Sequence, residues 1–279
     1  MNEVYEKHML RNEVELSRLT GQYNIISENL GYHIHPTIAA RLPKNPRVAD
    51  IGTASGLFLS KIAPMYPKAT LDGYDISSAF FPPETPSNIN LSILDARQPI
   101  PKDLEGIYDL VHVLFLCMGL FEEDWTPIVA NLSLLLKPGG ALQWEECNFL
   151  ASTWYRFYPE STYEAVYVME KLLLDAFASH MAYGYDTLPG DMEAAGLTDI
   201  GIDIIGSDRV KSTLALYTAV SMGVCFNWAR SGRDPIPYSK EQLDQLEAQS
   251  FRDIASGGYV RFDIHTNWGF RPLPETSVV

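Results

Sequence analysis

The sequence predicts an α/β fold in which helices cover a mostly parallel sheet, and two observations support this prediction. Short apolar segments that fit strands alternate with segments of helical period along the first half of the chain, as in a parallel sheet with helices on both faces. Residues 108–115 are also apolar nearly throughout, as expected for a strand that is covered on both faces.

The N-terminal part of the chain is predicted to be helical. Apolar residues recur at intervals of three to five positions between Val4 and Leu30. Gly21 is expected to interrupt this helix, and Gly31 is expected to end it. Residues 42–46, which include two prolines, are expected to connect the helix to the sheet.

The remaining elements follow from the same patterns. Strands are predicted at residues 47–51, 70–76, 89–94, 108–115, 141–145, 200–205 and 259–268. Helices are predicted at residues 57–65, 128–136, 161–180, 213–230 and 240–255. Thr126 and Pro127 would be the N-cap and first residue of the second helix. Ser161 and Glu164 have the spacing of a capping box, which would start the third helix.

The composition is that of an ordinary folded protein, with 46% hydrophobic and 20% charged residues. The 279 residues are enough for one large domain with additional segments, or for two small domains. With 21 basic and 35 acidic residues the net charge is −14, which argues against binding to nucleic acid or to an anionic membrane surface. The longest apolar run is too short to span a bilayer, which takes about 20 residues.

Cysteine usage and the N-terminal residues predict a cytoplasmic protein. Cys117, Cys147 and Cys225 are scattered and odd in number, so neither a disulfide framework nor a metal-binding motif is expected. This fits a reducing compartment. The charged N-terminal residues lack the apolar stretch of a secretory signal peptide. The sequence leaves the oligomeric state open.

A glycine-containing loop follows the first predicted strand, where α/β proteins bind ligands beyond the carboxyl ends of the strands. Its pattern is Asp50-x-Gly52-x-Ala54-x-Gly56. Counted from Gly52, the dinucleotide pattern G-x-G-x-x-G fails at Ala54 and Leu57, and no phosphate-binding G-K-[ST] follows. The loop therefore allows a ligand to approach the backbone closely, without special provision for pyrophosphate.

Two acidic residues end the next two strands. Asp75 lies about 20 residues after Gly52, where a carboxylate can accept hydrogen bonds from both ribose hydroxyls. Asp95 ends the third strand and precedes Ala96. Each acid alone could instead cap a turn or a helix. Together with the glycine loop, the two acids favour a ligand site at the carboxyl ends of the strands.

Five segments resemble, in order, the motifs of class I S-adenosylmethionine-dependent methyltransferases. They are VADIGTASG, LDGYDIS, ILDA, YDLVHV and LLKPGGALQWEE, and they lie within residues 47–146. The resemblance implies a seven-stranded Rossmann-like sheet, S-adenosylmethionine as the cofactor, and methyl transfer as the activity. Residues 19–31 are further similar to methyltransferases of fungal secondary metabolism.

The resemblance also implies which residues bind the cofactor. The loop after the first strand would surround the methionine part, Asp75 would bind the ribose, and Asp95 with Ala96 would flank the adenine. Ala54 departs from the family pattern, which usually has glycine there, and Leu114 stands where many relatives carry a polar or basic residue. The implied set is Tyr23, Asp50, Gly52, Thr53, Ala54, Gly56, Asp75, Ile76, Asp95 and Ala96.

The resemblance divides the chain into four parts. Residues 1–45 would form a helical cap, and residues 46–148 the cofactor-binding core. Residues 149–195 would form a helical insertion that shapes the substrate site. Residues 196–279 would complete the sheet with additional helices.

A catalytic base is needed only if the acceptor atom must lose a proton. The candidates are His33 and His35, which lie between the N-terminal helices and the sheet, and Glu145, which ends the fifth strand. The two histidines could equally occupy a surface loop. His112 lies inside the fourth strand and is expected to be a hydrogen-bonded core residue. Glu145 and Glu146 are expected to point to opposite faces of the sheet.

Residues 149–185 contain ten aromatic residues, which favours an apolar or aromatic acceptor, although helix packing would explain part of this enrichment. We therefore expect methyl transfer to a small, largely apolar or aromatic metabolite, at an oxygen atom. One alternative is an enzyme of the same fold that binds S-adenosylmethionine but catalyses a cyclisation or an elimination. Another is a regulator with a vestigial site.

Overall fold

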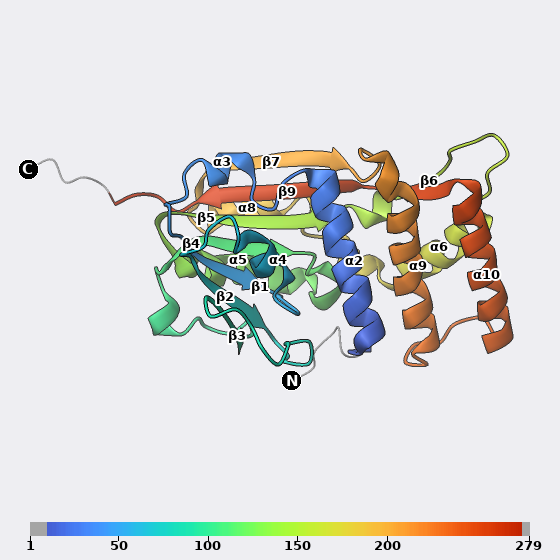
Figure 1. Cartoon of the computed structure of the whole chain (residues 1–279), viewed down its shortest axis with the longest axis horizontal. Coiled ribbons are helices and arrows are strands. Elements are labelled where there is room, and N and C mark those ends of the chain that lie inside the picture. Colours follow the sequence, from blue (N-terminus) through green and yellow to red (C-terminus); the bar gives the residue numbers. More distant parts are fainter. Residues whose placement is uncertain (1–9, 275–279) are drawn as a thin grey trace, which may run out of the picture. The chain divides into compact units, whose positions relative to one another are not determined.

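The computed structural model describes residues 10–274, in which a sheet of seven strands is accompanied by a sheet of two (Figure 1). The strands of the larger sheet are β1 (Arg47–Ile51), β2 (Thr70–Asp75), β3 (Ile89–Ile93), β4 (Tyr108–Leu114), β5 (Leu136–Cys147), β7 (Thr198–Gly206) and β9 (Asp263–Phe270). Their order is β3-β2-β1-β4-β5-β9-β7, and the pairs from β3 to β5 are parallel. The prediction of a seven-stranded, mostly parallel, Rossmann-like sheet is therefore confirmed.

Two compact units divide the described residues. The sheet unit comprises residues 32–146, 183–204 and 265–274, and the helical unit comprises residues 10–31, 147–182 and 205–264. Residues 1–9, with the predicted helical position Val4, and residues 275–279, at the end of the last predicted segment, lie outside the described residues.

Helices cover both faces of the sheet in the sheet unit. They are α3 (Pro36–Ala39), α4 (Leu57–Ile62), α5 (Glu122–Leu135) and α8 (Leu188–Ala194), with short 3-10 helices η1 (Lys102–Leu104) and η2 (Cys117–Gly119). On one face, the ring of Phe58 in α4 stacks on His112 of β4 with 3.6 Å between the ring centroids. On the other, Trp125 of α5 packs against Trp144 of β5 at 5.3 Å. His112 pairs with Gln143, so the alternation of side chains places Trp144 on the opposite face.

The start of α5 differs from the prediction. The helix begins at Glu122, and Pro127 lies inside it, so the prediction that Thr126 and Pro127 start the helix is wrong. Three consecutive acidic residues, at positions 122–124, occupy the first turn, where negative charge is favourable. The carboxylate of Asp124 also accepts the backbone N–H of Phe121 at 2.9 Å, which fixes the earlier start.

The helical unit contains four long helices and the smaller sheet. Its elements are α2 (Glu13–Leu30), α6 (Glu164–Ala176), α7 (Ala178–Met181), α9 (Leu214–Arg230), α10 (Lys240–Ser256), η3 (Phe149–Ala151), η4 (Lys211–Thr213), β6 (Thr153–Arg156) and β8 (Gly258–Arg261). The antiparallel strands β6 and β8 form the smaller sheet. Helix α9 packs against α2, α6 and α10.

Helix α2 runs without a break through Gly21, so the predicted interruption is wrong. Gly21 faces α9, since a Cβ atom at this position would lie 3.5 Å from Cγ2 of Val220, in ordinary van der Waals contact. The packing of α2 against α9 thus continues past a glycine that costs a helix about 1 kcal/mol. Gly31 ends the helix in the left-handed conformation with φ of 82°, as predicted.

The first turn of helix α6 is capped by a residue of helix α10 and not by the predicted capping box. It begins at Glu164, and Ser161 instead donates its hydroxyl to the carbonyl of Ser256 at 2.6 Å. Asp253 of α10 accepts the backbone N–H of Ala165 at 2.8 Å and so supplies the acceptor that the first turn needs. A contact between residues so far apart in the sequence cannot be deduced from local spacing.

The segment predicted as one strand at residues 259–268 forms two. Residues on either side of Phe262 belong to β8 and β9, which lie in different sheets. Two hydrogen bonds join Phe262 to Ser207. The carbonyl of Phe262 accepts the N–H of Ser207 at 2.9 Å, and the N–H of Phe262 donates to Ser207 Oγ at 3.1 Å. Among residues 10–274, no helix is long and apolar enough to cross a membrane.

Candidate functional site

The glycine-containing loop follows β1 at the edge of the sheet where the parallel strands end. The N–H of Thr53 donates to the carbonyl of Tyr74 in β2 at 2.9 Å, and its hydroxyl donates to Asp50 Oδ2 at 2.6 Å. Gly56, in the left-handed conformation with φ of 74°, leads into α4. These contacts hold the loop beside the end of β2, where Asp75 lies.

Gly52 is required by its conformation and by its surroundings. Its φ is 71°, in the left-handed region that favours glycine. A Cβ atom at this position would lie only 2.6 Å from Cδ2 of Leu116, in the segment that follows β4. Glycine therefore allows the loops after β1 and β4 to approach one another.

Asp75 links the ends of β1 and β2. Its Oδ2 accepts the N–H of Ala54 at 3.0 Å, and its Oδ1 accepts the N–H of Ser77 at 3.1 Å. Backbone N–H groups thus orient the carboxylate at the end of β2. A carboxylate accepts hydrogen bonds from hydroxyl groups, which is the chemistry that the ribose of the cofactor requires.

Ala54, the departure from the family pattern, adopts the left-handed conformation with φ of 48°. This conformation costs a residue with a Cβ atom about 1–2 kcal/mol. The backbone of the loop therefore has the shape that glycine would favour, and the N–H that binds Asp75 is in place without it.

Replacing Ala54 by glycine is therefore expected to raise the free energy of unfolding by about 0.5–1 kcal/mol, since the relieved strain exceeds the added flexibility of the unfolded chain. Urea denaturation measures this change. Ala248 is an exposed residue inside α10 and provides the control, because Ala248→Gly should lower the free energy of unfolding by about 1 kcal/mol. A loss of stability in both variants would contradict the assignment of strain to Ala54.

The carboxylate of Asp95 is held by Arg97, two positions later in the chain. The side chain of Arg97 donates to Asp95 Oδ1 at 2.9 Å and to Oδ2 at 3.1 Å, and Arg97 N–H donates to Oδ1 at 3.1 Å. Burial raises the pKa of Asp95, but these contacts outweigh it, so the pKa lies below its usual value. Ala96 is buried, and its carbonyl accepts from Asn131 at 2.8 Å. The two predicted adenine residues thus form a fixed turn after β3.

A buried charged cluster lies behind the loop, on the face of the sheet that α4 covers. His112 Nδ1 is 2.7 Å from Asp50 Oδ1, and His112 Nε2 is 3.3 Å from Glu145 Oε2. All three residues are at most 4% exposed. Burial alone would lower the pKa of His112, but the carboxylates of Glu145 and Asp50 outweigh it and raise the pKa to about 9. His112 is therefore a protonated core residue at neutral pH, which agrees with the expected hydrogen-bonded core histidine.

Gln143 extends this cluster to the residues that precede α3. Its Nε2 lies 2.6 Å from Glu145 Oε1 and 3.0 Å from the carbonyl of His33, to both of which it donates. Its Oε1 accepts the N–H of His35 at 2.8 Å. The backbone of residues 33–35 is thus tied to the carboxyl-end half of β5 by one fully buried amide.

The two candidate histidines differ in their surroundings. His35 stacks on Trp268 at 3.9 Å, accepts the N–H of Thr37 at Nδ1, and has Nε2 3.8 Å from Asp203. Burial lowers the pKa of His35, although Asp203 and Glu145 oppose this shift. The imidazole of His33 is only partly buried, and burial together with the positive charges of Lys61 and His112 lowers its pKa. Both histidines are therefore neutral at neutral pH.

Glu146 points away from Glu145, as the alternation of side chains predicts. Its Oε1 accepts the N–H of Leu116 at 2.7 Å and Trp144 Nε1–H at 3.1 Å. Burial raises the pKa of Glu146 to about 7, although these donors oppose the shift. Phe115, just before Leu116, adopts the left-handed conformation with φ of 52°. Glu146 therefore helps to hold a strained turn at the carboxyl end of β4, the kind of strain that concentrates at functional sites.

The structure places the remaining predicted residues in different parts. Ile76 follows Asp75 and is partly exposed. Tyr23 is buried in α2 and belongs to the helical unit. Sequence reasoning missed Gln143 and the Phe115–Leu116 turn. A polar residue between Leu142 and Trp144 in a buried strand was the signal for Gln143, whereas no sequence pattern marks the conformation of Phe115.

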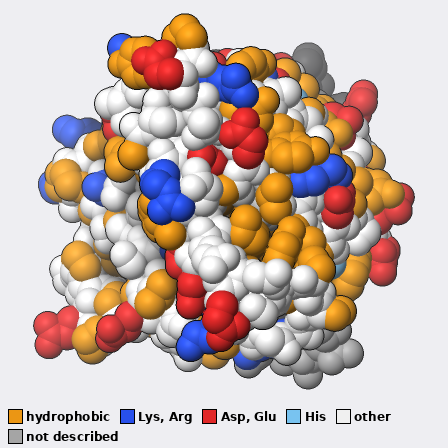
Figure 2. Space-filling view, turned by 90° about the vertical axis from the view of Figure 1, so that its right-hand side faces the viewer, with side chains coloured by type: hydrophobic (Ala, Val, Ile, Leu, Met, Phe, Trp, Pro, Cys, Tyr) orange, Lys and Arg blue, Asp and Glu red, His pale blue; other side chains and the backbone are white. Residues whose placement is uncertain are grey.

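The aromatic residues of positions 149–185 are partly buried and partly exposed. Trp154 donates to Glu170 at 2.8 Å, and Phe177 packs against Trp228 at 5.6 Å between ring centroids. Figure 2 shows hydrophobic side chains gathered in patches on the end of the molecule that carries α10 and β6. The exposed aromatic residues of this segment are Tyr155, Phe157, Tyr158 and Tyr167.

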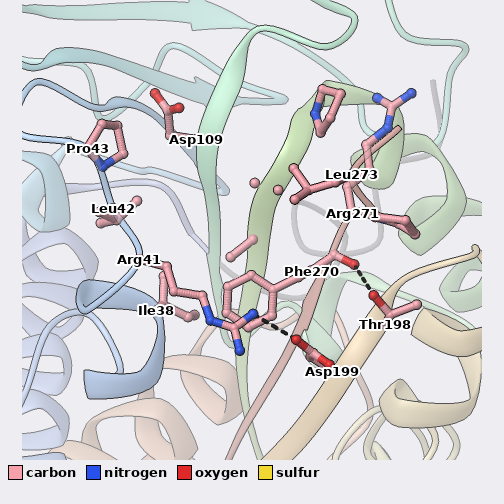
Figure 3. Close-up of a pocket in the computed structure, with 15 residues that line it drawn as sticks. Ile38, Arg41, Leu42, Pro43, Asp109, Thr198, Asp199, Phe270, Arg271 and Leu273 are labelled. Atoms are coloured by element: carbon pink, nitrogen blue, oxygen red, sulfur yellow. Dashed lines mark hydrogen bonds and ion pairs between the residues drawn. The ribbon is translucent and has the colours of Figure 1, made fainter. Parts of the chain in front are cut away.

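A cavity of about 620 Å³ lies at the opposite edge of the sheet, where β4 and β5 begin (Figure 3). Arg41 lies over the ring of Phe270 at 4.0 Å and pairs with Asp199 at 2.8 Å. Among the described residues, none of the predicted site residues lines this cavity. It is therefore separate from the loops at the carboxyl ends of the strands.

Known proteins resemble this chain in sequence and in fold. A family model described as "Methyltransferase domain" matches residues 49–142, which include the glycine loop, Asp75 and Asp95. The structure of Haemonchus contortus phosphoethanolamine N-methyltransferase 2 in complex with S-adenosylmethionine is similar in fold, with a TM-score of 0.50 and 12% identity. That likeness covers 85% of this chain and 53% of the other.

Three fungal relatives are more similar in sequence. The methyltransferase grgD of a Penicillium species is 35% identical over 48% of this chain and about half, 50%, of its own length. The N-methyltransferase sirN of Leptosphaeria maculans is 28% identical over 93% of each chain. The N-methyltransferase tcpN of Claviceps purpurea is 32% identical over 89% of this chain and 91% of its own. The chain therefore belongs to the family of S-adenosylmethionine-dependent methyltransferases that includes tcpN, and S-adenosylmethionine is its cofactor.

Proposed function

We propose that this methyltransferase transfers the methyl group to a nitrogen atom of a small, largely apolar metabolite. The observation that carries the proposal is the similarity to sirN and tcpN, two N-methyltransferases that align over at least 89% of this chain. The net charge of −14 further disfavours a nucleic-acid acceptor. The oxygen acceptor that we expected from the sequence stays a prediction, which the experiment below separates from nitrogen.

In this proposal, different residues at the carboxyl ends of the strands bind different parts of the cofactor. The loop from Gly52 to Gly56 would hold the methionine part of the cofactor, and Asp75 the ribose. Asp95 and Ala96 would lie beside the adenine. When bound, S-adenosylmethionine supplies a methyl group that its sulfonium activates for in-line displacement. The main task of the chain is then to orient the acceptor nitrogen toward that methyl group.

His33 is the proposed proton acceptor. Its pKa is lowered by burial, so its imidazole is neutral near pH 7 and can take the proton that the acceptor nitrogen loses. His35, by contrast, accepts the N–H of Thr37 and stacks on Trp268. Glu145 is held by His112 and Gln143. Both are therefore proposed to position neighbouring groups.

An assay with S-adenosylmethionine that carries a deuterated methyl group tests the proposal. The chain is incubated with matched small acceptors that offer either an N–H or an O–H group, and the products are analysed by mass spectrometry and NMR. We expect a labelled methyl group on nitrogen. A label on oxygen would confirm the oxygen prediction and overturn the nitrogen proposal. A product of unchanged mass would instead indicate a cyclisation or an elimination.

We also propose a division of the chain into parts: residues 149–195 shape the acceptor site, residues 46–148 form the cofactor-binding core, and residues 1–45 form a helical cap. Residues 196–279 would complete the sheet. The exposed aromatic side chains between Tyr155 and Tyr167 support this division, because exposed aromatic surface is suited to stacking on an apolar or aromatic molecule.

Replacing Tyr158 by alanine is expected to raise the KM for the acceptor roughly 2- to 10-fold, since a lost stacking contact costs about 0.5–1.5 kcal/mol. Steady-state kinetics with the acceptor found above measures this change. Phe251→Ala is the matched control, because Phe251 is as exposed as Tyr158, at 52%, and lies on α10. Equal KM values for both variants and the unchanged chain would overturn the proposed role of residues 149–195.

A further inference from the structure

We infer that a buried chain of hydrogen bonds, joined in the middle by the ion pair between His112 and Glu145, couples the cofactor loop to residues 33–35, with His112 as the positioning residue at its centre. The chain of contacts runs from Thr53 through Asp50, His112, Glu145 and Gln143 to the backbone of His33 and His35. The inference rests on the proposed cofactor site at the Gly52–Gly56 loop.

The first half of the chain of contacts connects the loop to β4. The Thr53 hydroxyl donates to Asp50 Oδ2 at 2.6 Å, and the other oxygen of Asp50 lies 2.7 Å from His112 Nδ1. Asp50 therefore has one oxygen on the loop and one on the histidine. A change in the position of Thr53 must be transmitted to His112 or must break one of these two contacts.

The second half connects β4 to residues 33–35. His112 Nε2 lies 3.3 Å from Glu145 Oε2, and Glu145 Oε1 accepts from Gln143 Nε2 at 2.6 Å. The amide of Gln143 then holds the carbonyl of His33 and the N–H of His35, at 3.0 and 2.8 Å. The chain of contacts is continuous across β1, β4 and β5, because Asp50, His112 and Gln143 are register partners on neighbouring strands.

Burial excludes water from this chain of contacts. The five side chains from Thr53 to Gln143 are at most 6% exposed, so water cannot replace a lost partner. Residues 33–35 lie between α2 and the four-residue helix α3, so their backbone has few helical hydrogen bonds of its own. The position of this segment therefore depends on the amide of Gln143.

The proton on His112 is required by the charges that face it. Asp50 faces it from β1 and Glu145 from β5, while α4 presents the apolar ring of Phe58. His33 also lies close enough to interact with this charge: burial lowers the pKa of His33, and the charges of Lys61 in α4 and of His112 lower it further. A neutral ring would leave two neighbouring buried carboxylates with a single donor between them. The raised pKa of His112, about 9, agrees with this geometry.

Hydrogen exchange of the full chain tests the coupling. Exchange of the backbone amides at residues 33–40 is measured with and without saturating S-adenosylmethionine. We expect the cofactor to slow this exchange by at least about 5-fold in the unchanged chain. Gln143→Met removes the amide and so breaks the chain of contacts, while a side chain of similar volume still fills the buried space. This variant should still bind the cofactor and should lose the protection.

Two further variants separate coupling from general stability. His112→Asn should also lose the protection of residues 33–40. Asp72→Asn is the control, since Asp72 is a buried acid of β2 that pairs with Arg47 and lies outside the chain of contacts. It should keep the protection even if it lowers stability.

A second measurement remains available if His112→Asn fails to fold. Hydrogen exchange of the unchanged chain at several pH values should show that the protection of residues 33–40 by the cofactor is lost as the pH rises through about 9, while Gln143→Met shows no such protection at any pH. Retained protection in Gln143→Met, or protection in the unchanged chain that does not change with pH, would overturn the coupling. Absence of cofactor binding by the unchanged chain would instead overturn the proposed cofactor site itself.

Discussion

Replacing Asp75 by alanine is expected to weaken the binding of S-adenosylmethionine by about 1–3 kcal/mol, or roughly 5- to 150-fold in Kd. The carboxylate is held by the N–H groups of Ala54 and Ser77, so it is already oriented for the ribose hydroxyls. Calorimetric titration at pH 7 measures the change.

The control for Asp75 lies on the same strand. Asp72 lies three residues before Asp75 in β2 and is bound by Arg47, Asn90 and Tyr108, so Asp72→Asn should leave the affinity for the cofactor near that of the unchanged chain. Unchanged affinity in Asp75→Ala would contradict the ribose role. A large loss in Asp72→Asn would show that any disturbance of β2 weakens binding.

Replacing His112 by alanine is expected to lower the free energy of unfolding by about 3–5 kcal/mol at pH 7, because it leaves the carboxylates of Asp50 and Glu145 buried and unpaired. Urea denaturation measures this loss. Phe58→Leu is a control, since it removes the ring that stacks on His112 and leaves the charges in place. Its cost should stay near or below about 1.5 kcal/mol.

The contribution of His112 should depend on pH in a defined direction. Its pKa is about 9 in the folded chain and 6.5 in the unfolded chain. A raised pKa stabilises the folded state fully below pH 6.5, and this stabilisation, on the order of 3 kcal/mol, is lost as the pH rises through 9. The difference in stability between the unchanged chain and His112→Ala should therefore shrink between pH 7 and pH 10. A constant difference would contradict a protonated His112.

The strands were the most predictable part of the fold. β1 has the predicted bounds, because the apolar run from Arg47 to Ile51 is limited by the connector before it and by Gly52 after it. The ends of α2 and α9 were predictable for a similar reason, since Gly31 and Arg230 end the apolar period of each helix. Local sequence therefore determined these boundaries.

The wrong boundaries have causes that lie far away in the sequence. Asp253 caps α6, although a local capping box was predicted there. Gly21 lies where α2 packs against Val220 of α9, so tertiary packing and not the local pattern accompanies the unbroken helix. Phe262 separates β8 from β9 because it pairs with Ser207. Each of these contacts joins residues that are distant in the chain, so no local pattern reveals it.

The candidate site likewise combines features that follow from local sequence with contacts between residues far apart in the chain. The glycine loop and Asp75 form a recognisable pattern, and the fold brings them within one hydrogen bond of each other. The role of Gln143 depends on the fold, because its amide serves residues 33–35, more than 100 positions earlier in the chain. Sequence alone could name His33, His35 and Glu145 as candidates, but it could not show that Gln143 joins them.

The crystal structure of the chain with S-adenosylhomocysteine bound tests the central claim most directly. We predict that both ribose hydroxyls lie within hydrogen-bond distance of the Asp75 carboxylate and that the methionine part lies against the backbone from Gly52 to Gly56. A cofactor bound elsewhere, or bound here without contact to Asp75, would contradict the proposed cofactor site.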